Sequence, residues 1–185
     1  STYAHFVARK DYRKTYDVYK DDTLLNRKPK KSRKIFVCLD EQRGQYLVDG
    51  LIAMDFPLSS GVKAYPTKTG DYTVISKKED HASNLYGKMY DAEGKCINYN
   101  AESTDPVPEG GRFDGSPMPY WQRLTNAGLG LHVGKVRRHP ISHGCVRLPR
   151  NVAEILYKQT SVGTPVTIQR TPLPVPEAQK APAVQ

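Results

Sequence analysis

A short stretch around Cys145 contains residue types that could perform nucleophilic catalysis. Cys145 follows Ser142, His143 and Gly144, and a further histidine, His132, lies upstream. The thiolate is the reactive form of cysteine, and a neighbouring imidazolium lowers the pKa of a thiol from its usual value of about 8.5. Glycine leaves room for an approaching carbonyl, and the backbone amides of Gly144 and Cys145 are candidates for stabilising an oxyanion. The stretch therefore predicts acyl transfer through Cys145.

The same residues allow two other interpretations. Cys145 could be a small buried residue beside a core histidine, or it could bind a metal together with His132 and His139. Zinc sites usually contain paired cysteines, whereas Cys38 and Cys96 stand alone and far from Cys145 in the sequence. The metal site is the weaker of these two alternatives.

Four further segments accompany this stretch in a recognisable order. They are Ile35–Asp40 followed by Gln42, then Pro57–Gly61, Tyr65–Tyr72, and Pro117–Trp121 leading into Gly130–His132. Together with Ser142–Arg147 they resemble the catalytic domain of the YkuD-type L,D-transpeptidases of bacterial cell walls, over about residues 35–169. The chain departs from many members in its short, basic stretch from Lys135 to Ile141 and in a turn, Pro66–Gly70, that is one residue longer.

The resemblance implies catalytic roles for individual residues. Cys145 is expected to be the nucleophile, and His132 the general base. His143 either positions the loop through a hydrogen bond or polarises the thiol. No acidic residue stands at an obvious third position, so a backbone carbonyl is expected to orient the base. The resemblance also implies acylation of Cys145 by carbapenems.

Other residues are expected to bind substrate or shape the site. The guanidinium of Arg147 could clamp a substrate carboxylate, with a structural ion pair as the alternative. Tyr120 and Trp121 either stack on a ligand or pack in the core. Ser142 is expected to hold its loop through hydrogen bonds, and Gly134 belongs to the histidine–x–glycine motif that opens the site.

The implied reaction is an acyl exchange on peptidoglycan stem peptides that requires no cofactor. The thiolate would attack a tetrapeptide stem, release D-alanine and pass the acyl group to an amine on a neighbouring stem. Water as the acceptor would make the protein an L,D-carboxypeptidase, and a lipoprotein lysine would make it an anchoring enzyme. A cysteine amidase acting on wall peptides and a non-catalytic wall-binding domain are the remaining alternatives.

Composition restricts the partners. The chain has 185 residues and a net charge of +9, which fits one domain and an anionic partner. No nucleic-acid-binding module accompanies the basic residues, so nucleic acid is not expected. No apolar run approaches the roughly 20 residues of a membrane helix. We expect a monomer exported to the periplasm or outer envelope face, with its leader removed.

The hydrophobic pattern predicts a mainly β domain with few short helices. Asp49-Gly50 between two β-rich runs is a strong hairpin signal. The resemblance implies a two-sheet sandwich with Cys145 at the floor of a cleft. The expected elements are strands at Ile35–Leu39, Gln45–Val48, Leu51–Met54, Asp71–Ile75 and Val162–Gln169, and a helix at Asn151–Gln159.

The chain divides into three parts. Residues 1–32 are expected to form a surface arm with one short helix and one strand, which covers an edge or core face of the domain. Residues 33–170 form the catalytic domain, in which Ser76–Arg123 is predicted to be a long irregular loop beside the cleft. Residues 171–185, rich in Pro and Ala, are predicted to be flexible. Cys38 and Cys96 are either disulfide-bonded or buried thiols, and the apolar strand around Cys38 favours a buried thiol.

Overall fold

A six-stranded sheet forms the centre of the computed structural model, which describes residues 2–183. Only the pair of β2 (Arg33–Cys38) with β13 (Pro165–Gln169) is parallel in this sheet. Between β3 (Arg43–Val48) and β4 (Leu51–Pro57), Asp49 and Gly50 form the hairpin turn with φ of +52° and +79°, the left-handed values that a tight turn requires, so the predicted hairpin is confirmed. In spatial order the strands are β1 (Tyr19–Lys20), β4 (Leu51–Pro57), β3 (Arg43–Val48), β2 (Arg33–Cys38), β13 (Pro165–Gln169) and β5 (Gly70–Thr73).

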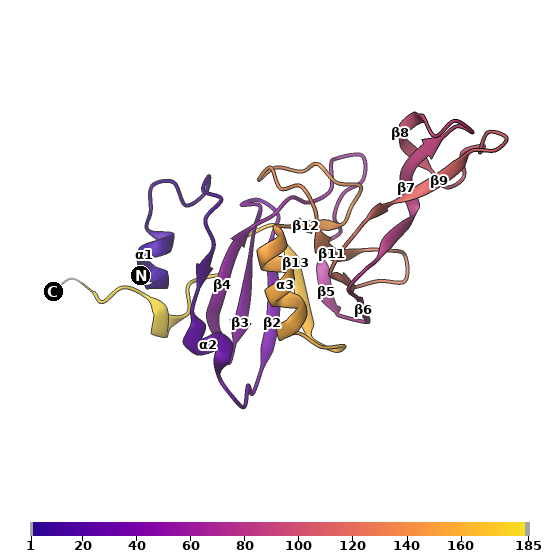
Figure 1. Cartoon of the computed structure of the whole chain (residues 1–185). Helices are drawn as coiled ribbons and strands as arrows, with labels where there is room; N and C mark the ends of the chain where they lie inside the picture. The colour runs from indigo at the N-terminus through magenta and orange to yellow at the C-terminus, as the bar shows by residue number, and fades with distance from the viewer. Residues whose placement is uncertain (1, 184–185) are drawn as a thin grey trace.

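A second, four-stranded sheet shares one hydrophobic core with the first. Its strands are β12 (Val146–Leu148), β11 (Gly130–Val133), β10 (Trp121–Arg123) and β6 (Ser76–Lys78). The predicted helix is α3 (Arg150–Gln159), which begins after Pro149 and packs into the same core (Figure 1). The side chains of Ile35, Phe56, Leu131, Leu148 and Leu156 are all at most 1% exposed in it. The expected mainly β, two-sheet architecture is confirmed.

The segment from Ser76 to Arg123 is not the irregular loop that the sequence predicted. Strands β7 (Ala82–Tyr90), β8 (Cys96–Glu102) and β9 (Arg112–Pro117) form an antiparallel sheet with β7 in the middle. We call this sheet the lobe; it projects from the body of the molecule (Figure 1). The prediction was wrong because most lobe side chains are exposed on both faces, so the sequence lacks the apolar alternation of a half-buried strand.

The N-terminal arm covers the outer part of the six-stranded sheet. It contains α1 (Tyr3–Val7), β1 and α2 (Asp22–Asn26), and it buries Tyr3, Phe6 and Tyr19 against Ile52 of β4. This is the covering role expected of residues 1–32.

The C-terminal tail packs on the same cluster. Leu173 and Val175 contact it, and the side chain of Gln179, in the short 3-10 helix Glu177–Gln179, binds both backbone groups of Ile52, with N···O distances of 2.7 and 3.0 Å. These contacts favour an ordered tail between Leu173 and Gln179, in contrast to the flexibility expected from its composition. Residues 184 and 185 lie outside the described part of the chain.

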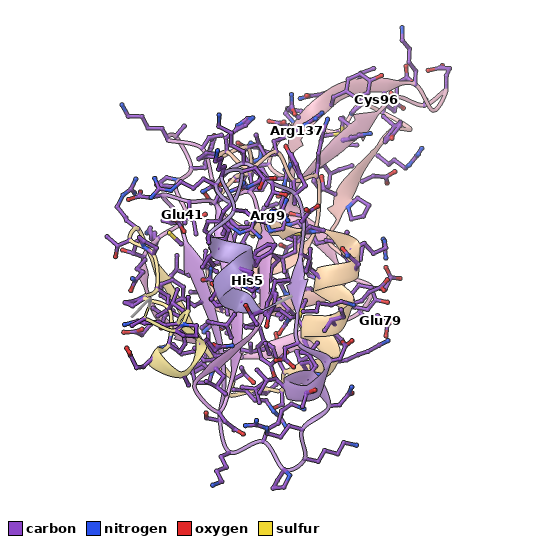
Figure 2. The ribbon with its side chains drawn as sticks, turned by 90° about the vertical axis from the view of Figure 1, so that its left-hand side faces the viewer. His5, Arg9, Glu41, Glu79, Cys96 and Arg137 are labelled. Atoms are coloured by element: carbon purple, nitrogen blue, oxygen red, sulfur yellow. The ribbon has the colours of Figure 1, made fainter. Side chains whose placement is uncertain are left out.

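All three cysteines are free thiols. Cys38 is fully buried in β2, where its thiol donates to the carbonyl of Arg170 at 3.2 Å, whereas Cys96 lies on the projecting lobe (Figure 2). The interpretation of Cys38 as a small buried thiol is confirmed. None of the helices formed by residues 2–183 has the length and apolar character needed to cross a membrane.

A buried carboxylate joins the arm to the sheet. Asp55 on β4 is 0% exposed and forms an ion pair with Arg43 of β3, which is also 0% exposed. The hydroxyls of Tyr3 and Tyr12 donate to the same carboxylate at 2.8 and 2.9 Å, and the amide of Gln45 donates at 3.0 Å. Burial, together with the Asp55 charge, raises the pKa of both tyrosines, so both remain protonated donors. These contacts satisfy a charge whose burial would otherwise be costly.

The same network reaches the loop between His132 and Cys145. Arg43 donates to the backbone carbonyl of Thr15 at 3.0 Å, and Arg138 in that loop donates to the same carbonyl at 3.1 Å. Arg138 also donates to the carbonyl of Glu41 at 2.7 Å. One carbonyl of the arm therefore holds an arginine from the sheet and an arginine from the loop.

The ion pair predicts a difference between two aspartate substitutions. Asp55→Asn leaves the Arg43 charge buried without its counter-charge and is expected to lower the free energy of unfolding by about 3–5 kcal/mol. Asp114→Asn removes a partner of Arg112 in an exposed pair, and we expect little or no loss. Urea denaturation followed by fluorescence measures both. Equal effects of the two substitutions would contradict the role given to Asp55.

Candidate active site

A cavity of about 620 Å³ is bordered by the second sheet and the lobe. Every predicted site residue except Tyr120 lines it, and these residues come from β10, from β11 and the residue after it, and from β12 and the turn before it. They are Trp121, His132, Gly134, Ser142, His143, Gly144, Cys145 and Arg147. The fold thus brings together residues that the sequence places in separate segments.

The pairing of β11 with β12 places the two central residues. The strands are parallel, and His132 on β11 stands directly opposite Arg147 on β12. Residues opposite each other share a face of the sheet, as do residues two positions apart along a strand. Cys145 is the residue before β12, and it lines the same cavity as His132 and Arg147.

His132 is held as a neutral imidazole. Its side chain is 6% exposed, and Nδ1 lies 2.6 Å from the backbone carbonyl of Val133. A carbonyl only accepts hydrogen bonds, so Nδ1 carries the hydrogen and Nε2 keeps a free lone pair. Burial lowers the pKa of His132 to about 4. The ring can therefore accept a proton at neutral pH, and its orienting partner is a backbone carbonyl, as expected.

Cys145 rests as a thiol. Its Sγ donates to the backbone carbonyl of Gly128 at 3.2 Å. Burial raises the pKa of Cys145, and the nearby charges of Arg147 and Arg123 offset this only in part. Burial disfavours the thiolate of Cys145 and the imidazolium of His132, so the structure does not support a resting ion pair between these two residues.

The turn before Cys145 is fixed by two hydroxyl groups. Ser142 Oγ donates to the carbonyl of Cys145 and accepts the amide hydrogen of Gly144 at 3.1 Å. Thr67 Oγ1 donates to the carbonyl of Gly144 at 2.6 Å and accepts the amide hydrogen of Gly61 at 2.8 Å. Gly144 has φ of +119°, a conformation that favours glycine. The loop-holding role predicted for Ser142 matches these contacts.

These contacts change the candidate oxyanion donors. The Gly144 amide is already bonded to Ser142, so it is not free as the sequence suggested. Within residues 2–183, the amide of Cys145 has no hydrogen-bond acceptor and remains the candidate donor.

Gln42 holds the backbone of Ser60, which in turn binds the turn before Cys145. Its side chain donates to Ser60 Oγ at 2.8 Å and accepts the Ser60 amide hydrogen at 2.9 Å. The carbonyl of Ser60 in turn accepts the amide hydrogens of Ile141 and Ser142 at 2.9 and 3.0 Å. The glutamine quoted in the sequence resemblance thus acts through the Pro57–Gly61 segment.

His143 faces the lobe. Its ring stacks on Tyr86 of β7 with centroids 4.5 Å apart and an interplanar angle of 12°, and it meets the edge of Tyr65 at 4.8 Å. These ring contacts replace the hydrogen bond that was predicted to position its loop. Tyr86 gave no signal in the sequence, because it lies in the segment that was expected to be irregular.

The two aromatic residues before β11 have different environments. Trp121 is 2% exposed, stacks on His81 with centroids 5.0 Å apart, and lies 6.1 Å from the ring of His132. Tyr120 points instead to helix α3, where it meets the edge of Tyr157 at 5.4 Å. Its predicted place on the substrate is not supported, since it packs against the core outside the cavity lining. Sequence reasoning missed His81 for the same reason as Tyr86.

Arg147 lies across Gly134. A Cβ at position 134 would stand 2.8 Å from both Cγ and Cδ of Arg147, so only glycine leaves room for this side chain. Among residues 2–183 the guanidinium has no ion pair or hydrogen-bond acceptor. The alternative of a structural ion pair is therefore not supported, and the group is available to an anion.

The metal alternative also lacks the required geometry. His139 is exposed and does not line the cavity. Over residues 2–183, no three side chains of His, Cys, Asp or Glu gather closely enough to hold a metal ion.

Reaction of Cys145 with iodoacetamide is expected to accelerate with pH beyond neutrality, without a plateau in mild acid. Only the thiolate reacts, and burial keeps both Cys145 and His132 uncharged near neutral pH. Mass spectrometry of the Cys145 peptide gives the rate between about pH 5 and about pH 9.5. A plateau from mildly acidic to neutral pH that is lost in His132→Gln would reveal a resting ion pair and contradict this prediction.

Comparison with known proteins identifies relatives of most of the chain. Residues 32–168 match the model of the YkuD family, which is described as the L,D-transpeptidase catalytic domain. Probable L,D-transpeptidase 3 of Mycobacterium tuberculosis (strain ATCC 25618 / H37Rv) is 32% identical over 120 residues, which is 61% of this chain and 38% of that protein.

Solved structures share the fold over 75% of this chain. An L,D-transpeptidase from Mycobacterium smegmatis has a TM-score of 0.57 at 22% identity, with 58% of its chain covered. A cysteine-to-serine mutant of the Enterococcus faecium L,D-transpeptidase gives 0.54 at 26% identity and 50% coverage. An L,D-transpeptidase in complex with imipenem gives 0.58 at 17% identity and 59% coverage. This chain thus spans 38% of the curated relative and 50 to 59% of these solved chains.

Proposed function

The chain belongs to the YkuD family of L,D-transpeptidase catalytic domains, and from this premise we propose that Cys145 is its nucleophile on peptidoglycan stem peptides. The observation that carries the proposal is the state of His132. Its Nε2 has a free lone pair, its ring is neutral, and it shares a cavity with Cys145. A neutral base beside a protonated thiol is suited to deprotonate it during attack.

The first half of the reaction forms an acyl-enzyme. Nε2 of His132 takes the thiol proton while Sγ of Cys145 bonds to the carbonyl carbon of the stem peptide. The Cys145 amide donates to the resulting oxyanion. When the C–N bond breaks, the imidazolium returns the proton to the departing amine of D-alanine, and a thioester remains.

The second half transfers the acyl group. An amine of a neighbouring stem attacks the thioester, His132 accepts a proton from that amine, and the C–S bond breaks. The thiolate then regains its proton from His132, so the site returns to its starting state. A lipoprotein lysine would follow the same steps, and water would give a carboxypeptidase product.

Arg147 supports substrate binding in this scheme. Its unpaired guanidinium lines the same cavity as Cys145, where it can form a bidentate contact with a carboxylate of the stem. The positive charge of the chain suits the same anionic polymer. We further propose that the protein acts as a monomer outside the cytoplasm, in the periplasm or at the outer envelope face.

Carbapenem acylation is proposed by analogy with the imipenem-bound relative. A strained lactam carbonyl would occupy the position of the stem carbonyl and acylate Cys145. The leaving amine stays tethered to the acyl group in that case, so the adduct is expected to persist.

Muropeptide analysis tests the proposal. Incubation with tetrapeptide-stem monomers is expected to give dimers lighter than two monomers by one D-alanine, as measured by mass spectrometry. Cys145→Ala should give none, and His132→Gln should slow the reaction by about 10²–10⁴-fold through loss of the base. Cys96→Ala is the matched control, because Cys96 lies on the lobe outside the cavity lining.

The products distinguish the alternatives. Shortened monomers without dimers would assign a carboxypeptidase. Untouched substrate in the presence of wild-type protein, while a known L,D-transpeptidase consumes it, would contradict the proposal. Equal activity of Cys145→Ala and wild type would remove Cys145 from the mechanism.

A further inference from the structure

Every charged side chain in the cavity lining, apart from the histidines, is cationic. Lys68, Arg123, Lys135 and Arg147 line it, and the described lining contains no Asp or Glu. A cleft with one sign of charge and low-dielectric walls concentrates ligands of the opposite sign. One arginine would suffice for one carboxylate, so the second arginine needs its own explanation.

The strand register places the two arginines on different sides of the nucleophile. Arg123 on β10 pairs with Gly130 on β11, and Arg147 on β12 pairs with His132 two residues further along β11. Residues two apart on a strand share a face, so Arg123 and Arg147 face the same side, and both line the cavity with Cys145, the residue before β12. Strand spacing puts the Arg123 Cα roughly 10 Å from that of Cys145 across the sheet, and the Arg147 Cα roughly 7 Å from it along β12.

Both guanidiniums are available to a ligand. Arg147 has no ion pair or acceptor within residues 2–183, and burial lowers its pKa. Arg123 has one long hydrogen bond, 3.4 Å, to the carbonyl of Thr125, and it lies 5.3 Å from the ring centroid of Trp121. An aromatic face orients a guanidinium without neutralising its charge. Each group can therefore take a carboxylate without giving up a stronger partner.

We propose that Arg123 is a specificity-determining residue that binds a second carboxylate of the acyl donor, across the sheet from Cys145, whereas Arg147 binds the first carboxylate along β12. This inference rests on the proposed function, because it concerns the substrate of the same site. The site then selects stems with a free carboxylate on both the acyl residue and the leaving residue. A stem in which either carboxylate is an amide binds more weakly.

Equilibrium binding to Cys145→Ala tests the inference without turnover. Three synthetic tetrapeptide stems are compared by isothermal titration calorimetry: the unmodified stem, one with an amide at the leaving residue, and one with an amide at the acyl residue. Each amide is expected to weaken binding about tenfold or more, as for the loss of a charged hydrogen bond. Adding Arg123→Gln should remove discrimination against one amide only, and adding Arg147→Gln should remove discrimination against the other.

Two control variants complete the experiment. Arg123→Lys keeps the charge and is expected to retain most of the discrimination, which separates recognition from misfolding. Arg112→Gln removes an exposed arginine of the lobe outside the cavity lining, and it should leave all three affinities unchanged.

Three results would overturn the inference. They are equal affinity for the three stems, no measurable binding of any stem, and loss of discrimination against the same amide in both arginine variants. The proposed function is judged separately, from dimers made by the protein with Cys145 intact. Discrimination in binding without acyl transfer would remove the transpeptidase proposal and leave the role of Arg123 standing.

Discussion

The buried ion pair between Asp55 and Arg43 is the contact on which the arrangement of the molecule depends. Both side chains are fully buried, so neither tolerates the loss of the other. Because the remaining donors and acceptors come from the arm and the neighbouring strands, the pair fixes the arm against the sheet. Arg138 extends the same network to the loop that joins the histidine strand to the cysteine turn. The loop that leads to the cysteine turn is thus tied to the same buried network.

The buried network at Asp55 contains charged groups, whereas the buried thiol and imidazole of the cavity are neutral. At Asp55 the protein buries a carboxylate and surrounds it with donors. In the cavity it buries a thiol and an imidazole, gives each one backbone carbonyl, and keeps both neutral. The charges that remain in the cavity belong to arginines and lysines without counter-ions in the described structure. In the proposed mechanism, the thiol of Cys145 would therefore lose its proton to His132 only during attack on the substrate.

Eight residues that the sequence singled out line the cavity, and much of the fold was predicted as well, for identifiable reasons. Cys145 and His132 lie in a dense motif, and Asp49-Gly50 needs φ above zero, so local chemistry sufficed for both. The lobe was missed because a sheet exposed on both faces leaves no apolar pattern. The protonation states of Cys145 and His132 depend on burial, which only the packed structure reveals. The involvement of the Gly144 amide with Ser142 is likewise a matter of three-dimensional geometry, and so is the position of Tyr86 over His143.

The shared carbonyl of Thr15 has a consequence for where the domain begins. The family match starts at residue 32, but one backbone acceptor of both Arg43 and Arg138, the carbonyl of Thr15, lies in the preceding segment. A protein trimmed to the matched region would lose this acceptor and keep only Asp55 for Arg43 and the Glu41 carbonyl for Arg138. The start of the family match therefore separates the sheet from an N-terminal segment that is hydrogen-bonded to it. A protein expressed from residue 32 onward would keep the cysteine motif but would lack the arm carbonyl that binds Arg43 and Arg138.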